Sequence, residues 1–158
     1  MALDFDSARL SNPYVTAEHE EWRSQLRRFI DKEIMPYAEE WDEAGSIPDA
    51  LWPKAAETGM FGLGYPEALG GLEEGIDIWH HNILNEEMSR IGAGGVSSTL
   101  LVHCIGLPPV AKFGSDAIKQ AVVPAVLAGE KRISLGITEP GAGSDVAQLS
   151  TTAVRDGD

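Results

Sequence analysis

The residues best suited to binding chemistry form one small-residue loop after an apolar run. They read Thr138-Glu139-Pro140-Gly141-Ala142-Gly143-Ser144-Asp145. Gly141 and Gly143 have no Cβ, so they can adopt positive φ and let a ligand approach the main chain closely. The amides from Gly143 to Asp145 can form an anion-binding concavity, with the Ser144 hydroxyl as an extra donor. The loop is therefore a candidate site for a phosphate or a flat ring.

The segment before the loop has the pattern of a strand. From Ile133 to Ile137, apolar residues alternate with Ser134 and Gly136, which is the period of a strand with one buried face. Pro140 lacks an N–H and pushes Glu139 into an extended conformation. We expect the strand to end there, with the loop directly after its C-terminal end.

Two familiar phosphate-binding motifs are missing from this loop. The dinucleotide fingerprint G-x-G-x-x-G needs a third glycine at the position that Val146 occupies, and no Gly-Lys-Ser/Thr follows. A nicotinamide-type site and a P-loop are therefore disfavoured. On loop physics alone, a plain connecting turn remains an alternative.

A series of short motifs precedes the loop along most of the chain. With the segment from Ile133 to Asp158, they follow the order and spacing of the acyl-CoA dehydrogenase family, which the chain resembles over nearly its whole length. The motifs are Pro66-Glu67, Gly70-Gly71, Glu86-Glu87-Met88-Ser89-Arg90, Leu101-x-His103, Phe113-Gly114, Lys119-Gln120, Pro124, Leu127 and Gly129-Glu130.

The resemblance implies a mainly α fold. Residues 1–130 correspond to the family's up-and-down helical N-terminal domain, and residues 131–158 to the first strand or strands of its β-barrel-like middle domain. The residue pattern also changes from helical to strand-like near residue 130. Family members are much longer, so the chain is expected to be an amino-terminal fragment.

The resemblance also implies a cofactor and a reaction. The cofactor is FAD, and the reaction is the α,β-dehydrogenation of an acyl-CoA thioester to the enoyl-CoA. Electrons pass to an electron-transfer flavoprotein, and the full-length assembly is a homotetramer or dimer. The residues implied to contact FAD are Leu135, Gly136, Ile137, Thr138, Gly141, Ala142, Gly143 and Ser144, with Ser144 also close to the thioester substrate.

The sequence lacks one feature of the family and differs from the family in another. The family's catalytic base is a glutamate in its last domain, and no residue here has its context, so no catalytic residue is assigned. We expect the chain alone to bind FAD weakly and to be inactive. Family members often have an aromatic residue before the loop, where this chain has Leu135 and Gly136, so one flavin face is expected to pack differently.

Two alternatives remain open at this stage. The first is a flavin-dependent monooxygenase or nitroalkane-oxidase-like relative of the same fold. The second is a non-catalytic helical interaction module. The match at Thr138-Glu139-Pro140 favours the dehydrogenase, whereas an open apolar edge at Ile133 to Ile137 would suit association.

Composition narrows the expected partners and location. The net charge is −13 with only 12 basic residues, which disfavours nucleic acid and anionic membranes. No run approaches the length of a membrane-spanning helix, and Met1 to Leu10 lacks the features of a signal or transit peptide. The single Cys104 cannot form an intramolecular disulfide. We expect a cytoplasmic protein without nucleic-acid or membrane partners.

Helical periodicity predicts the elements ahead of the loop. Pro108 and Pro109 are expected to restart the chain before the last helix, and Gly129 to close that helix. The predicted helices are Thr16 to about Met35, Asp49 to Thr58, Ile76 to Ile91, Val96 to Ile105, and Asp116 to Leu127.

Three adjacent pairs have side chains that also occur in active sites. His80-His81 suggests a metal, His103-Cys104 a nucleophile with its base, and Glu86-Glu87 an acid/base pair. Neighbours on a helix point to different faces, so structural roles are favoured for all of them. For the glutamates, we expect one exposed side chain and one bound to a cation such as Arg90.

Overall fold

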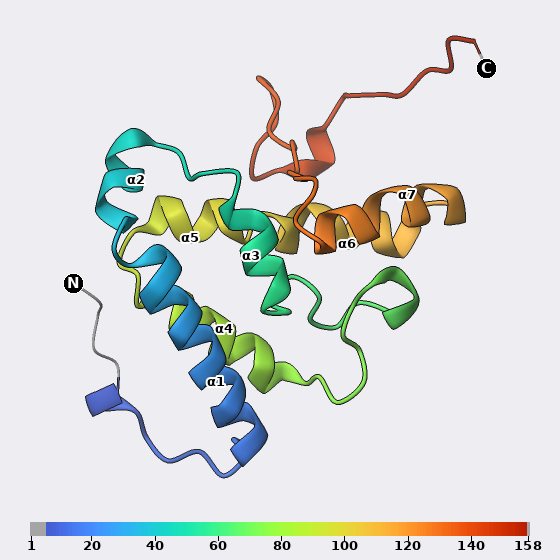
Figure 1. Cartoon of the computed structure of the whole chain (residues 1–158). Coiled ribbons are helices and arrows are strands. Elements are labelled where there is room, and N and C mark those ends of the chain that lie inside the picture. Colours follow the sequence, from blue (N-terminus) through green and yellow to red (C-terminus); the bar gives the residue numbers. More distant parts are fainter. Residues whose placement is uncertain (1–5, 158) are drawn as a thin grey trace.

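Seven α-helices make up the body of residues 6–157, the part of the chain that the computed structural model describes (Figure 1). Residues 1–5 and 158 lie outside it. The outer ends of the two expected domains and the first half of the segment Met1 to Leu10 therefore also lie outside the described residues. The helices are α1 (Ala17–Phe29), α2 (Ala38–Ala44), α3 (Leu51–Glu57), α4 (Ile78–Ser89), α5 (Gly94–Leu100), α6 (His103–Phe113) and α7 (Asp116–Leu127). This confirms the mainly α fold class.

The first predicted helix is confirmed and continues through a π-helical turn. Thr16 caps α1, because its hydroxyl accepts from the His19 amide and its own amide donates to His19 Nδ1. The buried face of α1 continues from Leu26 into the turn Ile30–Ile34, where both end residues are 0% exposed. Its apolar stripe packs on α4, as Figure 1 shows for the lower half of the molecule.

The helices α3, α4 and α7 begin and end close to the predicted positions. Asp77 caps α4, and Ser115 caps α7. Gly129 follows the end of α7 with φ +72°, a conformation that glycine adopts without strain. Short 3-10 turns at Asp6–Ala8, Glu67–Leu69 and Val146–Gln148 complete the helical elements.

The predicted helix from Val96 to Ile105 is wrong, because two helices share that region. α5 ends at Leu100 and α6 begins at His103, so Pro108 and Pro109 lie inside α6 instead of restarting the chain. A proline inside a helix loses one hydrogen bond to the carbonyl four residues earlier. Leu107, which is 0% exposed in the core, indicates that burial outweighs this cost.

The stretch Gly94–Phe113 also corrects the expectation that no run approaches a membrane span. It has 20 residues and is apolar enough to cross a membrane by length and composition. A core helix of a protein that never enters a membrane meets the same two criteria. Here Val96, Leu100 and Leu107 belong to the hydrophobic core shared with the other helices.

The expected strand does not form within residues 6–157, because its segment has no paired backbone there. The segment 132–138 follows α7, and its first residues, Ile133 and Ser134, pass against α6 at Gly106 (Figure 1). Isolated bridges join Leu63 to Leu72 and Glu139 to Ala142, and neither involves this segment. Leu135 and Ile137 are 42% and 40% exposed, so the predicted buried face is not formed. Side-chain alternation favours a strand, but the strand forms only with a partner backbone.

Candidate ligand-binding site

A mainly apolar cavity of about 690 Å³ lies where the C-terminal segment leaves the helices. Its size is that of a small-molecule pocket. Its walls include Trp52 of α3, Thr99 of α5, the connection Leu101 to Val102, Ile105 of α6, and residues 132–134. None of these cavity residues was singled out as a site residue from the sequence. Trp52 and the apolar residues from Leu101 to Ile105 were interpreted as core, because helical periodicity does not distinguish the core side of a helix from a cavity side.

A glycine of α6 brings the C-terminal segment against the helices. A Cβ on Gly106 would lie 3.2 Å from the Cα of Ser134 and 3.3 Å from the carbonyl carbon of Ile133. This contact is tighter than an ordinary van der Waals contact, so the absence of a side chain is what admits the segment. The start of the segment is thereby held as one wall of the cavity.

Replacing Gly106 by valine is expected to push the segment away from α6. The valine methyl groups would occupy the space of the Ser134 backbone, and the neighbouring bonds after Lys131 and Arg132 would become more accessible. Limited trypsin digestion should then cleave severalfold faster at these residues. Gly136→Val is the matched control, because a Cβ there meets nothing within 4 Å. Equal cleavage rates in both variants would contradict the packing role.

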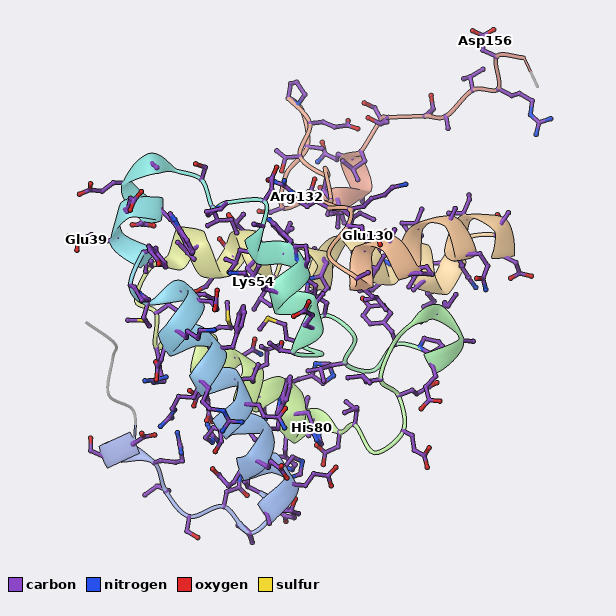
Figure 2. The ribbon with its side chains drawn as sticks, viewed as in Figure 1. Glu39, Lys54, His80, Glu130, Arg132 and Asp156 are labelled. Carbon is purple, nitrogen blue, oxygen red and sulfur yellow. The ribbon has the colours of Figure 1, made fainter. Side chains whose placement is uncertain are left out.

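The rim of the cavity holds a cation and an unused donor. The Arg132 guanidinium lies 5.3 Å from the centre of the Trp52 ring and pairs with Asp49 of the preceding loop. Figure 2 shows Arg132 beside α3, at the junction with the C-terminal segment. Trp52 Nε1 is buried and has no hydrogen-bond partner among residues 6–157. Such an orphaned donor is uncommon in folded proteins and marks this wall as unusual.

The predicted loop is open to solvent, and its main chain is mostly unbonded. Glu139 and Ala142 close a tight turn by two hydrogen bonds, N to O of 2.8 Å and 3.1 Å. Ala142 is buried, while the other seven predicted site residues are exposed. In the described part of the chain, no hydrogen bond occupies the amides of Gly143, Ser144 and Asp145, or the hydroxyls of Thr138 and Ser144. Their donors are available to a ligand.

The two loop glycines act differently from the prediction. Neither Gly141 nor Gly143 has positive φ. A Cβ on either would meet nothing within 4 Å. These glycines leave open space beside the amides, so close approach to the main chain, and not a left-handed turn, is what they permit.

The structure places the predicted residues next to the cavity but not in its wall. Ile133 and Ser134 line the cavity, and the predicted residues begin immediately afterwards at Leu135. An elongated ligand in the cavity therefore has the loop amides further along the same segment. The ligand contacts of Leu135 to Ser144 stay a prediction.

His103 and Cys104 lie close together, contrary to the expectation from helix geometry. Cys104 Sγ is 3.6 Å from His103 Nε2, because both sit in the first turn of α6. Burial lowers the pKa of His103 to about 4 and raises the pKa of the Cys104 thiol. The pair is therefore neutral at pH 7, and the nucleophile interpretation gains no support.

His80 has metal-type neighbours that its sequence context did not reveal. Ligand atoms of His19, Asp77 and His80 all lie within 4.8 Å of one another. Asp77 Oδ1 is 3.0 Å from His19 Nε2 and 3.0 Å from His80 Nδ1. These hydrogen bonds join the capping boxes of α1 and α4. The positive ends of both helices meet here, which opposes a cation. The cluster therefore links the N-termini of α1 and α4 by hydrogen bonds.

The paired glutamates behave as expected. Glu86 is half-exposed, whereas Glu87 is 0% exposed. Glu87 accepts hydrogen bonds from Arg27, Arg23 and Arg90, with the Arg90 Nη1 to Oε2 distance at 3.1 Å. Burial alone would raise the pKa of Glu87, but Arg27, Arg23 and Arg90 lower it below its ordinary value. The carboxylate holds α1 to α4 and is unavailable for acid/base chemistry.

Comparisons with known proteins agree on one family. Residues 16–130 match the family model for the acyl-CoA dehydrogenase N-terminal domain. The chain is 32% identical over 142 residues to the mitochondrial long-chain specific acyl-CoA dehydrogenase of Sus scrofa, covering 90% of this chain and 32% of that protein.

Solved structures extend the likeness to the fold. A probable acyl-CoA dehydrogenase from Mycobacterium abscessus superposes with a TM-score of 0.82 and 43% identity, over 90% of this chain and 38% of that one. An acyl-CoA dehydrogenase from Bacillus anthracis, complexed with FAD, gives a TM-score of 0.76 and 30% identity, over 89% and 24%. The chain thus spans well under half the length of these relatives.

Proposed function

Because the chain belongs to the acyl-CoA dehydrogenase family, we propose that it supplies the helical part of a FAD-dependent enzyme. That enzyme oxidises an acyl-CoA thioester to the enoyl-CoA. The observation that supports this most is the exposed loop of unbonded amides directly beyond an apolar cavity. The family likeness alone would leave open whether this sequence retains a usable binding surface.

The loop residues fit FAD in chemistry and in space. The amides of Gly143 to Asp145 and the Ser144 hydroxyl are unpaired donors within residues 6–157, as a phosphate or ring carbonyl requires. A Cβ added to Gly143 would meet no atom within 4 Å, so the space beside the main chain is open there. Leu135 and Ile137 offer exposed apolar surface for a ring. FAD, when bound, supplies the acceptor for the hydride that leaves the β-carbon.

The cavity fits the acyl chain of the substrate. Leu101, Val102 and Ile105 provide apolar walls, which favour hydrocarbon over water. An acyl chain held in this cavity would direct its thioester toward the loop. Orientation of this kind lowers the barrier to reaction. Ser144 would then donate near the thioester end.

The remaining partners and the location belong to the same proposal. Electrons would pass to an electron-transfer flavoprotein, and the working assembly would be a homo-oligomer, a tetramer or a dimer. A role in fatty acid metabolism and a cytoplasmic location are further parts of the proposal, the latter supported by the single Cys104. No residue here is proposed as the catalytic base.

Titration of the purified chain with FAD tests the proposed site. Quenching of flavin fluorescence should report weak binding, with a Kd on the order of 10 µM or higher. Gly143→Val should raise the Kd about tenfold, because its side chain would cover the unbonded amides while meeting no protein atom within 4 Å at its Cβ.

Two controls make this result decisive. Gly94→Val lies equally open at the start of α5 and should leave the Kd unchanged. An assay with an acyl-CoA and a reducible dye should show no turnover by the chain alone. Equal FAD binding by the Gly143 and Gly94 variants would contradict the loop assignment, and ordinary turnover would contradict the absence of a catalytic base.

A further inference from the structure

Glu139 makes an unusual set of contacts at the base of the loop. Its Oε2 accepts from the Ser150 amide at 2.9 Å and from the Ser150 hydroxyl at 2.8 Å. Its Oε1 accepts from the Thr151 amide at 2.8 Å. Each carboxylate oxygen thus accepts at least one main-chain donor, and bonds to a charged acceptor are stronger than neutral ones.

These bonds close the loop into a ring. They join residue 139 to residues 150–151, and the two hydrogen bonds between Glu139 and Ala142 tighten the near end of the same ring. Asp145 stiffens the far side by accepting from the Ala147 amide at 3.2 Å and from Gln148 Nε2 at 2.7 Å. The unbonded amides from Gly143 to Asp145 lie between these two anchored points.

Apart from the buried Ala142 near its start and the local bonds made by Asp145, little else holds the ring within residues 6–157. The segment 143–151 contains exposed residues throughout, so no hydrophobic burial holds its shape. Its main-chain hydrogen bonds to the rest of the chain consist of those to the Glu139 carboxylate. Without that carboxylate, only local contacts would remain to offset the backbone entropy that ordering the segment 143–151 costs.

We propose that Glu139 is a positioning residue that pre-organises the loop amides for FAD by clamping Ser150 and Thr151. This inference builds on the proposed function and assigns a role to a residue outside the predicted contact set. The carboxylate does not touch the ligand in this role. It fixes the main chain whose amides do, so that binding does not have to order the loop.

The clamp requires an ionised carboxylate of this length. A glutamine at 139 replaces one accepting oxygen by an NH₂ group. This NH₂ group would face the amide N–H of Ser150 or Thr151, and two donors cannot form a hydrogen bond with each other. Hydrogen bonds from Thr151 and Ser150 hold the pKa of Glu139 at about 2. Its folded pKa is depressed, so the clamp is present above the ordinary value of 4.5 and is lost as the pH falls toward 2.

The test measures loop order and FAD affinity separately. Heteronuclear NOE values of the amides of Gly141, Gly143 and Ser144 are recorded without FAD for the wild type, Glu139→Gln and the control Glu130→Gln. Glu130 is exposed and is placed at the start of the C-terminal segment (Figure 2). We expect the NOE values to fall only in Glu139→Gln, with the thermal midpoint unchanged, and its Kd for FAD to rise about tenfold.

The pH profile separates the clamp from a general structural role. Wild-type loop order should stay constant from pH 7 to about 5 and decline toward pH 2 to 3, while the variant stays disordered throughout. Unchanged NOE values in Glu139→Gln would overturn the proposal whatever FAD does. Lost loop order with unchanged FAD affinity would overturn the positioning role. If the wild type binds no FAD while the loop responds as expected, the clamp stands and the proposed function fails.

Discussion

Replacing Glu87 by glutamine is expected to lower the free energy of unfolding by about 3 kcal/mol, near the low end for breaking a buried ion pair. Glu87 is 0% exposed and binds Arg27 at 2.7 Å and 2.9 Å. Glutamine keeps the size but leaves partly buried guanidinium groups without their counter-charge. Arg27 also pairs with Asp6, which limits the loss. Urea denaturation followed by circular dichroism measures it.

The pH dependence of this loss has a defined sign. The folded pKa of Glu87 is lowered relative to 4.5, so its contribution is complete above that value and disappears as the pH falls through the folded pKa. The difference between wild type and Glu87→Gln should therefore be largest at pH 7 and shrink below pH 4.5. Glu21→Gln, an exposed position on the same helix α1, is the control and should stay within about 0.5 kcal/mol of wild type. A pH-independent difference would contradict an ionic role.

Gly129→Ala is expected to destabilise the fold by about 2–4 kcal/mol for two separate reasons. Its φ of +72° lies in the left-handed region, which costs any residue with a Cβ about 1–2 kcal/mol. A Cβ there would also lie 2.5 Å from the carbonyl oxygen of Trp52 and 2.9 Å from the nitrogen of Pro53. Both neighbours are backbone atoms of α3 and cannot move aside freely.

Gly94→Ala is the matched control for this prediction. Gly94 opens α5, has no positive φ, and would place its Cβ in open space. Alanine there should be neutral or stabilising by about 0.4–1 kcal/mol, because it restricts the unfolded chain. Thermal unfolding of both variants checks the contrast. Similar midpoints would show that the contact between Gly129 and Trp52 is not needed.

These two positions also matter for the proposed site. Glu87 holds α4 against α1, and α4 carries Asn85 into the cavity wall. Gly129 lets the end of α7 approach Trp52, which forms another wall, just before the segment 132–134 begins. Damage at either position is therefore expected to weaken ligand binding as well as stability, although neither residue lines the cavity.

Local patterns were enough to predict most of the helices. The cap at Thr16, the buried stripe through Leu26 and the stop at Gly129 depend on neighbours in the sequence, so their positions could be read directly. The loop from Thr138 to Ser144 was also recognisable, since its openness follows from small residues that have little to bury. The prediction that Glu87 or its neighbour binds Arg90 used helical spacing alone.

Contacts between distant segments could not be predicted in this way. Val96 to Ile105 divides into α5 and α6, and Pro108 and Pro109 continue a helix, because core packing outweighs local preference. The hydrogen bond between His19 and Asp77 links α1 to the N-cap of α4. The strand expected at Ile133 to Ile137 lacks a partner among the described residues.

Amino-acid order thus determined the ends of α1, α3, α4 and α7 to within a few residues, and which loop is open, because caps, periodicity and glycine act over short distances along the chain. Folding in three dimensions decided the cavity, the approach of Ser134 to Gly106, and the closure of the loop by Glu139. Each of these depends on the distance between atoms far apart along the chain, and that distance is set by the packing of whole elements.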